Sequence, residues 1–412
     1  MYDLIGIGGG ASGMMAAGRA AELGKKVLLL EKNRTLGEKL KITGGGRCNI
    51  TNAEYDVQQF LKRYGKAEQF LYSIFAQFGV KETFSFFESR GLPLVVQAQK
   101  RAFPETEKAF DVYKVLERYI KKGGVIVRTA TPVTRVETDT TGNIVGIYSG
   151  TEVFRAPTYI LATGSLSHPE TGSTGDGFVW LKKLGHTIHE PTPTIVPLKV
   201  KDGWSKKLSG SSLSFMKITF YMEGKKKFSE TGKILFTHFG LSGPLILNSA
   251  HKVADLLYGG VVTAAIDAYP NTDLGTLEKK VITVFDAHKN KALKNVIKEF
   301  VPEGLHTGIA ALLIDMGIDI KKQINSITKE ERKKIVHVLK ALPLTIEGLM
   351  GFDRAVVADG GVPLEEIDMR TMRSLKAPNL LVTGDLLHIN RPSGGFSLQL
   401  CWTTGFVAGS QV

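Results

Sequence analysis

Glycines near the start of the chain have the spacing of a dinucleotide-binding turn. Gly8, Gly10 and Gly13 form a G-x-G-x-x-G pattern directly after an apolar stretch at residues 2–7. Glycines at these positions permit a tight turn and let the backbone approach a pyrophosphate at the positive end of a helix. Glu31 follows the next apolar stretch, where an acid hydrogen-bonds an adenosine ribose and disfavours a 2′-phosphate. The pattern therefore predicts FAD or NAD. Because no second such pattern exists, we favour one tightly bound FAD, with any nicotinamide docking transiently.

Two more polar motifs follow apolar stretches and are predicted to lie at strand ends. They are Ala162-Thr163-Gly164 and Gly384-Asp385. In a doubly wound sheet, ligands bind at the carboxyl ends of the strands. Asp385 is therefore a candidate partner for a ribityl hydroxyl or for a hydroxyl on the pyrophosphate side of the cofactor.

A glycine-rich run at residues 43–52, TGGGRCNITN, suits a loop wrapped round a polar ligand. Arg47 is predicted to be available for a phosphate or carboxylate. Cys48 is either a proton donor or a small packed residue. His238, in the run FTHFGLSGP, is either a structural histidine or a substrate contact, and Ser242 resembles a helix cap more than a nucleophile.

The order of apolar stretches indicates where the chain changes character. Residues 2–30 predict a strand, an Ala-rich helix at residues 11–23 and a second strand. Aromatic residues at helical spacing in 56–91 predict core packing, and residues 124–160 predict a β-meander. Prolines near residue 191 precede short strands typical of a small antiparallel barrel or sandwich. A helical period follows from 275 to 340, and strand and loop character returns after residue 343.

Composition excludes several protein classes. The 412 residues are 43% hydrophobic and 23% charged, which excludes disordered and collagen-like chains. Two cysteines, Cys48 and Cys401, cannot form a disulfide framework, so we expect a reducing cytoplasm. No signal peptide, bilayer-spanning run or metal-ligand spacing is visible.

The chain is basic, with a net charge of +13, and eight lysines lie between Lys199 and Lys227 against Asp202 and Glu223. Such a surface attracts nucleic acid, anionic membrane or anionic small molecules. It is also compatible with a solvated surface that binds no partner. The candidate RNA-binding residues are Lys206, Lys207, Lys225, Lys226 and Lys227.

Taken together, these motifs resemble the BaiN/RdsA-like (aminoacetone-oxidase-like) family of FAD-dependent NAD(P)H oxidoreductases. The resemblance rests on IGGGASG at 7–13, GEKLKITGGGRCNITN at 37–52, ATGSLSHPETGSTGDG at 162–177, ILFTHFGLSGP at 234–244 and SGGFSLQ at 393–399. RAFPETEKAFDV at 101–112, ADGGVPLEEID and TMRS before residue 375, and TTGFVAG near the end also match. Asp385 stands where the family has glutamate, His388 where it has an acid, and Phe396-Ser397 where it has Tyr-Asn.

The resemblance implies an α/β fold with a doubly wound FAD-binding domain built from both chain ends, residues 1–190 and 344–412. It implies a small inserted β-barrel at 191–272 and 335–343 and a helical insert at 273–334. The implied activity takes hydride from NAD(P)H and delivers it through flavin N5 to a conjugated C=C. The substrate is either ribosomal RNA, giving dihydrouridine, or a small-molecule enone such as a dehydro-bile acid. A non-catalytic flavin-binding protein is the third alternative.

The expected site residues follow from the motifs and the resemblance. Candidate catalytic residues are Cys48, His238 and His388. The candidate cofactor-binding residues are Gly8, Gly10, Ala11, Ser12, Gly13, Glu31, Lys32, Lys39, Gly45, Gly46, Arg47, Cys48, Asn49, Thr163, Gly164, Gly384, Asp385, Gly395 and Phe396.

Overall fold

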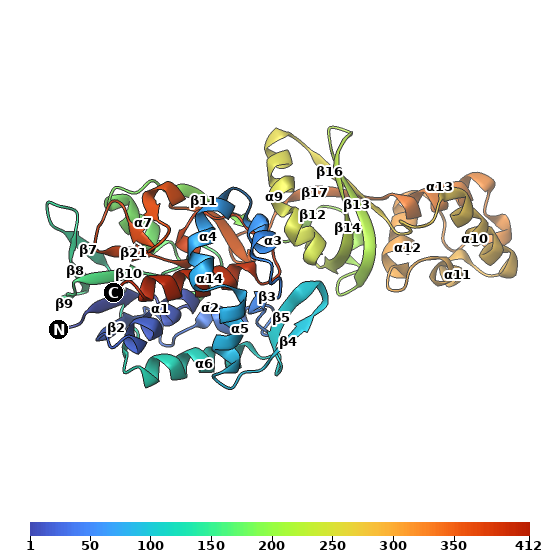
Figure 1. The fold of residues 1–412 in the computed structure, drawn as a ribbon. Helices are drawn as coiled ribbons and strands as arrows, with labels where there is room; N and C mark the ends of the chain where they lie inside the picture. The colour runs from blue at the N-terminus through green and yellow to red at the C-terminus, as the bar shows by residue number, and fades with distance from the viewer. The chain divides into compact units, whose positions relative to one another are not determined.

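Two units make up the fold in the computed structural model, which describes residues 1–412 (Figure 1). The first unit comprises Met1–Pro193 and Ala355–Val412, and the second comprises Thr194–Arg354. The chain returns to the first unit later than residue 344, because strand β17 (Leu342–Leu349) is still paired with two strands of the second unit. No helix is both long and apolar enough to cross a membrane.

A seven-stranded sheet forms the centre of the first unit, in the order β19-β20-β21-β10-β1-β2-β6. Its parallel strands are β1 (Leu4–Ile7), β2 (Val27–Leu30), β6 (Ile126–Arg128), β10 (Thr158–Leu161) and β21 (Leu380–Val382). Strands β20 (Arg373–Ser374) and β19 (Ile367–Asp368) continue it antiparallel. The strands are short and wholly apolar in the centre, as expected when helices cover both faces of a parallel sheet.

The predicted meander at 124–160 is wrong in its first strand. β6 pairs in parallel with β2 in the main sheet. Only β7 (Arg135–Thr138), β8 (Ile144–Ser149) and β9 (Glu152–Phe154) form an antiparallel three-stranded sheet. A short edge strand and a meander strand have the same alternating pattern, so the sequence alone does not separate them.

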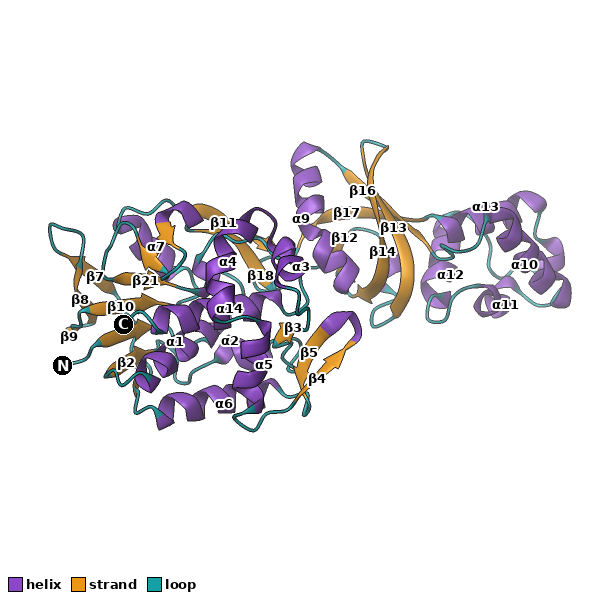
Figure 2. Ribbon diagram, viewed as in Figure 1, coloured by secondary structure: helices purple, strands orange, loops and turns teal.

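Helices α1 (Ala11–Glu22) and α14 (Phe396–Gly409) pack closely, although their residues are far apart in the sequence (Figures 1 and 2). A side chain at Gly405 would lie 2.5 Å from the Ser12 carbonyl oxygen, and one at Gly409 would lie 2.3 Å from that of Ala16. The two glycines therefore let the backbones touch. The other elements of this unit are α2 (Glu38–Ile42), α3 (Val57–Leu61), α4 (Glu68–Gln77), α5 (Val80–Glu88), α6 (Ala109–Lys122), α7 (Asp176–Lys183), β3 (Thr51–Asn52), β4 (Leu94–Gln97), β5 (Arg101–Pro104), β11 (His189–Thr194) and β18 (Val357–Gly361).

The second unit consists of a closed antiparallel barrel and a group of helices. The barrel order is β12-β15-β14-β13-β16-β17. Its strands are β12 (Leu198–Val200), β13 (Ser212–Met222), β14 (Lys225–Thr237), β15 (Gly240–Ser242), β16 (Val262–Asp267) and β17. The helices are α8 (Gly203–Lys206), α9 (Pro244–Gly259), α10 (Leu274–Ala287), α11 (Leu293–Phe300), α12 (His306–Asp315) and α13 (Lys329–Lys340). Closure leaves the barrel without an exposed sheet edge.

Candidate functional site

The three motif glycines of the β1–α1 turn have different surroundings. A side chain at Gly8, whose φ is 100°, would lie 2.5 Å from the Ala162 carbonyl oxygen. One at Gly13 would lie 1.9 Å from the carbonyl oxygen of Gly8, whereas one at Gly10 would meet nothing within 4 Å. Gly8 and Gly13 therefore let the chain approach itself, and Gly10 leaves open space at the N-terminus of α1.

Glu31 lies at the end of β2 and points back to the glycine turn. Its side chain accepts hydrogen bonds from the Gly9 N–H at 2.7 Å and from the Asn33 N–H at 2.8 Å. Burial raises the pKa of Glu31, while the two backbone N–H groups and Lys32 act in the opposite direction. Lys32 itself pairs with Asp176 at 2.7 Å, so this lysine is engaged within the protein.

The motifs after β10 and β21 come together because the two strands are neighbours, with Tyr159 opposite Leu380 and Leu161 opposite Val382. Just beyond β10, the hydroxyl oxygens of Thr163 and Ser165 are buried and have no hydrogen-bond partner within the protein. Buried polar groups are nearly always bonded, so these two hydroxyls at a strand end are exceptions within the protein. Gly164 between them has a φ of 72°.

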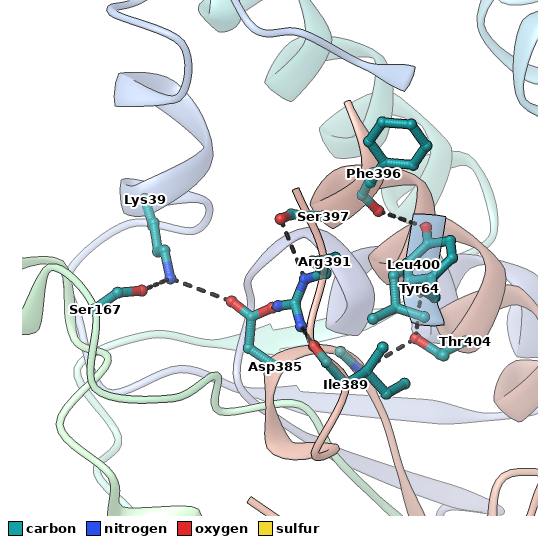
Figure 3. Close-up of polar contacts among 11 residues, drawn as sticks. Lys39, Tyr64, Ser167, Asp385, Ile389, Arg391, Phe396, Ser397, Leu400 and Thr404 are labelled. Atoms are coloured by element: carbon teal, nitrogen blue, oxygen red, sulfur yellow. Dashed lines mark hydrogen bonds and ion pairs between the residues drawn. The ribbon is translucent and has the colours of Figure 1, made fainter. Parts of the chain in front are cut away.

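A network of charged side chains joins three parts of the first unit that are distant in the sequence (Figure 3). The Lys39 ammonium donates to the hydroxyl of Ser167 and lies 3.3 Å from Asp385 Oδ2. The Arg391 guanidinium donates to Asp385 Oδ1 and to the Ile389 carbonyl, and its side chain is 1% exposed. Burial favours a higher pKa for Asp385, but the charges and hydrogen bonds of Arg391 and Lys39 hold it below its usual value. Asp385 is therefore a carboxylate.

Cys48 and Asn49 of the glycine-rich run are held inside the first unit. Cys48 is fully buried, and burial raises the pKa of its thiol. A buried thiol that holds its proton strongly is a poor acid, so the packing alternative describes Cys48. The Asn49 amide, oriented with its nitrogen toward the Ala102 and Thr51 carbonyls, accepts from the Gly395 N–H at 2.9 Å.

Arg47 has partners within the protein, and its role toward a phosphate or carboxylate stays a prediction. It pairs with Glu107, donates to Gln97 Oε1 at 2.8 Å and stacks 4.5 Å from the centre of the Phe103 ring. Its Nε is buried without a partner.

Some of the remaining expected cofactor residues border open space, and others are packed tightly inside the first unit. Ala11 and Ser12 form the first turn of α1, and side chains at Gly45 and Gly46 would meet nothing within 4 Å. Gly384 and Gly395 sit tightly against Ser12 and Thr51. The Phe396 ring is buried against Phe60 and Tyr64, and its carbonyl accepts from the Tyr64 hydroxyl at 2.9 Å. Phe396 is thus a core residue whose backbone begins α14.

The two candidate histidines belong to different units. His388 in the first unit lies 3.6 Å from Asp359 and its ring centre is 4.4 Å from that of His189. Burial lowers the pKa of His388, with Asp359 acting in the opposite direction. His238 lies exposed in the turn between β14 and β15 of the second unit, where its ring contacts only Phe239 among aromatic neighbours.

The predicted lysines lie on the second unit. Lys206 is the last residue of α8 and Lys207 follows it. Lys225, Lys226 and Lys227 begin β14 and are all exposed.

Sequence reasoning missed Arg391, Ser165 and Ser167. All three lie in irregular segments after a strand, where no periodicity or motif spacing marks a side chain as inward. The available signals were the family motif at 162–177, which contains both serines, and the position of Arg391 six residues after Asp385.

Comparison with protein families places this geometry in a known context. A family model described as "HI0933-like protein Rossmann domain" matches residues 2–411. The chain belongs to the HI0933-like family. This confirms the resemblance indicated by the motifs, and it agrees with a glycine turn, an acid at the end of β2 and a parallel sheet. With this family membership, we assign the chain to the FAD-dependent oxidoreductases.

Individual members differ in what their names say they act on. A 3-dehydro-bile acid delta(4,6)-reductase of Clostridium scindens is 30% identical over 407 residues, 98% of this chain and 97% of that protein. A ribosomal RNA dihydrouridine synthase of Haemophilus influenzae is 27% identical over 405 residues, 97% of this chain and 96% of that protein. The structure of 3-ketosteroid-delta4-(5alpha)-dehydrogenase from Rhodococcus jostii RHA1 matches with a TM-score of 0.56 at 15% identity, covering 100% and 96% of the two chains, and shows a shared fold.

Proposed function

We propose that this HI0933-like protein reduces a conjugated C=C bond, with NAD(P)H as the electron source and a uracil of ribosomal RNA as the substrate. When bound, FAD supplies the transfer of hydride between nicotinamide and substrate. The observation that supports an RNA substrate is the uneven charge. The second unit has 24 lysines and arginines against 16 acidic residues, so it holds +8 of the net charge of +13. Lysines that neutralise phosphates provide most sequence-independent affinity for nucleic acid.

The residues of the first unit fit FAD. The open space at Gly10, next to the free N–H groups of the first turn of α1, suits the pyrophosphate. Glu31 would bind the adenosine ribose, because its carboxylate retains acceptor sites beside its two backbone bonds. The Thr163 and Ser165 hydroxyls and the Asp385 carboxylate would bind polar groups further along the cofactor.

The chain must also provide a proton for the second carbon of the reduced bond. His388 is the candidate that the structure favours over Cys48, because its side chain is 37% exposed and lies beside the Asp359 carboxylate. The carboxylate favours the protonated imidazole, although burial has the larger effect and lowers the pKa of His388. His238 remains an alternative from the second unit.

A small-molecule enone is the second candidate substrate. The relative named as a 3-dehydro-bile acid reductase is 30% identical across nearly the whole chain. An enone and a uracil both present a C=C bond polarised by a neighbouring carbonyl, so the same reduction applies to either.

The test uses the FAD-loaded protein under anaerobic conditions. We expect NADH or NADPH to bleach the visible flavin absorbance, and deproteinised ribosomal RNA to restore it with formation of dihydrouridine. The rate with RNA should fall steeply with salt, while the rate with a 3-keto-4-ene steroid should not. Restoration by the steroid alone would replace the RNA proposal with the enone. A flavin that neither nicotinamide reduces would contradict both and leave a non-catalytic flavin protein.

A further inference from the structure

Phe215 lies at an irregularity in the β13–β14 hairpin of the barrel. Pairing between the strands includes Leu213 opposite Ile234 and resumes with Met216 opposite Gly232. Ser214 and Phe215 therefore face a single residue of β14, Lys233. This is a β-bulge, and bulges redirect side chains away from the regular alternation of a strand.

The bulge turns an aromatic ring into solvent. Phe215 has a φ of 57°, a backbone conformation that bulky side chains rarely adopt. Its side chain is 74% exposed, while Leu213 and Met216 on either side are buried in the barrel. Both the backbone conformation and the exposed ring are unfavourable in the isolated protein. Contact of the ring with a partner would offset the cost of exposing the ring to water.

The surface round the ring is basic. Lys233 lies opposite the bulge and Lys217 follows Phe215 by two residues; both are exposed and neither forms an ion pair. Residues 211–217 and 231–235, which we name the bulge surface, contain no aspartate or glutamate. The carboxylate of Asp267, opposite Lys217 on β16, is paired with Lys340 at 2.7 Å.

We propose that the bulge surface binds single-stranded RNA, with Phe215 stacked on an unpaired base and with Lys217 and Lys233 at the flanking phosphates. This combination of an aromatic platform and cationic side chains binds single strands with little sequence preference. A second copy of the chain fits less well, since two such surfaces repel each other. The choice of RNA as partner rests on the proposed function.

The test measures binding of the FAD-loaded full chain to a fluorescent oligouridylate of about 12 nucleotides, within the range of known site sizes. Phe215→Ala should weaken binding by about 5- to 150-fold, the value of one stacked base, and Phe215→Tyr should restore it. The double variant Lys217→Gln and Lys233→Gln should reduce the slope of log affinity against log salt by about 1.4, because each phosphate contact on a single strand contributes about 0.7. The matched control is Phe110→Ala, which removes an exposed phenylalanine of α6 in the first unit and should leave binding unchanged.

Three outcomes would overturn the inference. They are wild-type RNA affinity in Phe215→Ala, loss of a dimer instead of RNA affinity in that variant, and Phe215-dependent binding to phosphatidylglycerol vesicles but not to RNA. Because the ring is exposed, Phe215→Ala should fold, and its circular dichroism spectrum and melting temperature check this.

Dihydrouridine formation separates this inference from the proposed function. If the wild-type enzyme makes dihydrouridine and Phe215→Ala makes it equally well at limiting RNA, the bulge surface is not used and the proposed function stands. If the wild-type enzyme makes none but binds oligouridylate through Phe215, the proposed reaction fails and the surface stands.

Discussion

Replacing Gly10 with valine tests the cofactor site without disturbing the fold. Gly10 has φ −79° and ψ −167°, which any residue adopts, and a side chain there would meet no protein atom within 4 Å. The free energy of unfolding of the apoprotein should therefore change by no more than about 1 kcal/mol. In the holoprotein the new side chain would occupy the space assigned to the pyrophosphate.

The loss of FAD affinity follows from the bonds that the valine would displace. A hydrogen bond from a backbone N–H to a charged phosphate contributes about 1.5–3 kcal/mol. Losing two of them weakens FAD binding by about 3–6 kcal/mol, or roughly 150- to 20,000-fold in Kd. Isothermal titration of the apoprotein with FAD measures this, and thermal unfolding of the same apoprotein measures the fold.

Two further glycine variants serve as controls. Gly203→Ala, at the start of α8, also enters open space and should leave both measurements unchanged. Gly13→Val should destabilise the apoprotein itself, because its side chain would lie 1.9 Å from the Gly8 carbonyl oxygen. Wild-type FAD affinity in Gly10→Val would refute this assignment of the pyrophosphate.

Three other variants test the charged and buried groups of the first unit. Arg391→Met leaves the buried Asp385 carboxylate with Lys39 alone. Urea unfolding should therefore show a free energy of unfolding lower by about 3–5 kcal/mol, and adding Asp385→Asn should recover much of this loss. A loss under 1 kcal/mol would contradict a buried ion pair. His186 is buried beside Glu366 and Ser374, at 2.8 Å and 2.7 Å. Burial lowers its pKa from the ordinary value of 6.5, so its contribution to the free energy of unfolding should be full above pH 6.5 and should fall as the pH drops from 6.5 to the lowered value. The variant His186→Gln should lack this fall in stability. A pH profile identical to that of the wild type would contradict the role of His186. Cys48→Ala should keep at least about half of the activity, since the thiol is buried; a loss of 100-fold or more, with FAD content intact, would restore the proton-donor role.

The parts of the site predicted from the sequence are those where backbone geometry demands a residue type. Gly8 and Gly13 are required by close approach within the turn, and the acid at residue 31 ends a wholly apolar strand, so both are visible in the sequence. The meeting of the Thr163 and Asp385 motifs was also predictable, because parallel strands bring their carboxyl ends to one edge.

The parts that were missed depend on tertiary contacts. Arg47 looks free in the sequence, but its partner Glu107 comes from a loop 60 residues away. Arg391 lies in a polar loop, and only the folded chain buries it beside Asp385. Phe215 sits in an alternating strand pattern, and nothing in that pattern reveals the bulge that turns its ring outward. Local periodicity records which face a residue occupies in a regular element, and these residues lie where the elements are irregular.

The most direct test of the proposed function is the dihydrouridine content of ribosomal RNA, measured by mass spectrometry in cells of the source organism with this protein present, deleted and restored. We expect a dihydrouridine that disappears on deletion and returns with the wild-type chain but not with Gly10→Val. An unchanged dihydrouridine content after deletion would contradict the RNA assignment and leave reduction of a small-molecule enone as the function.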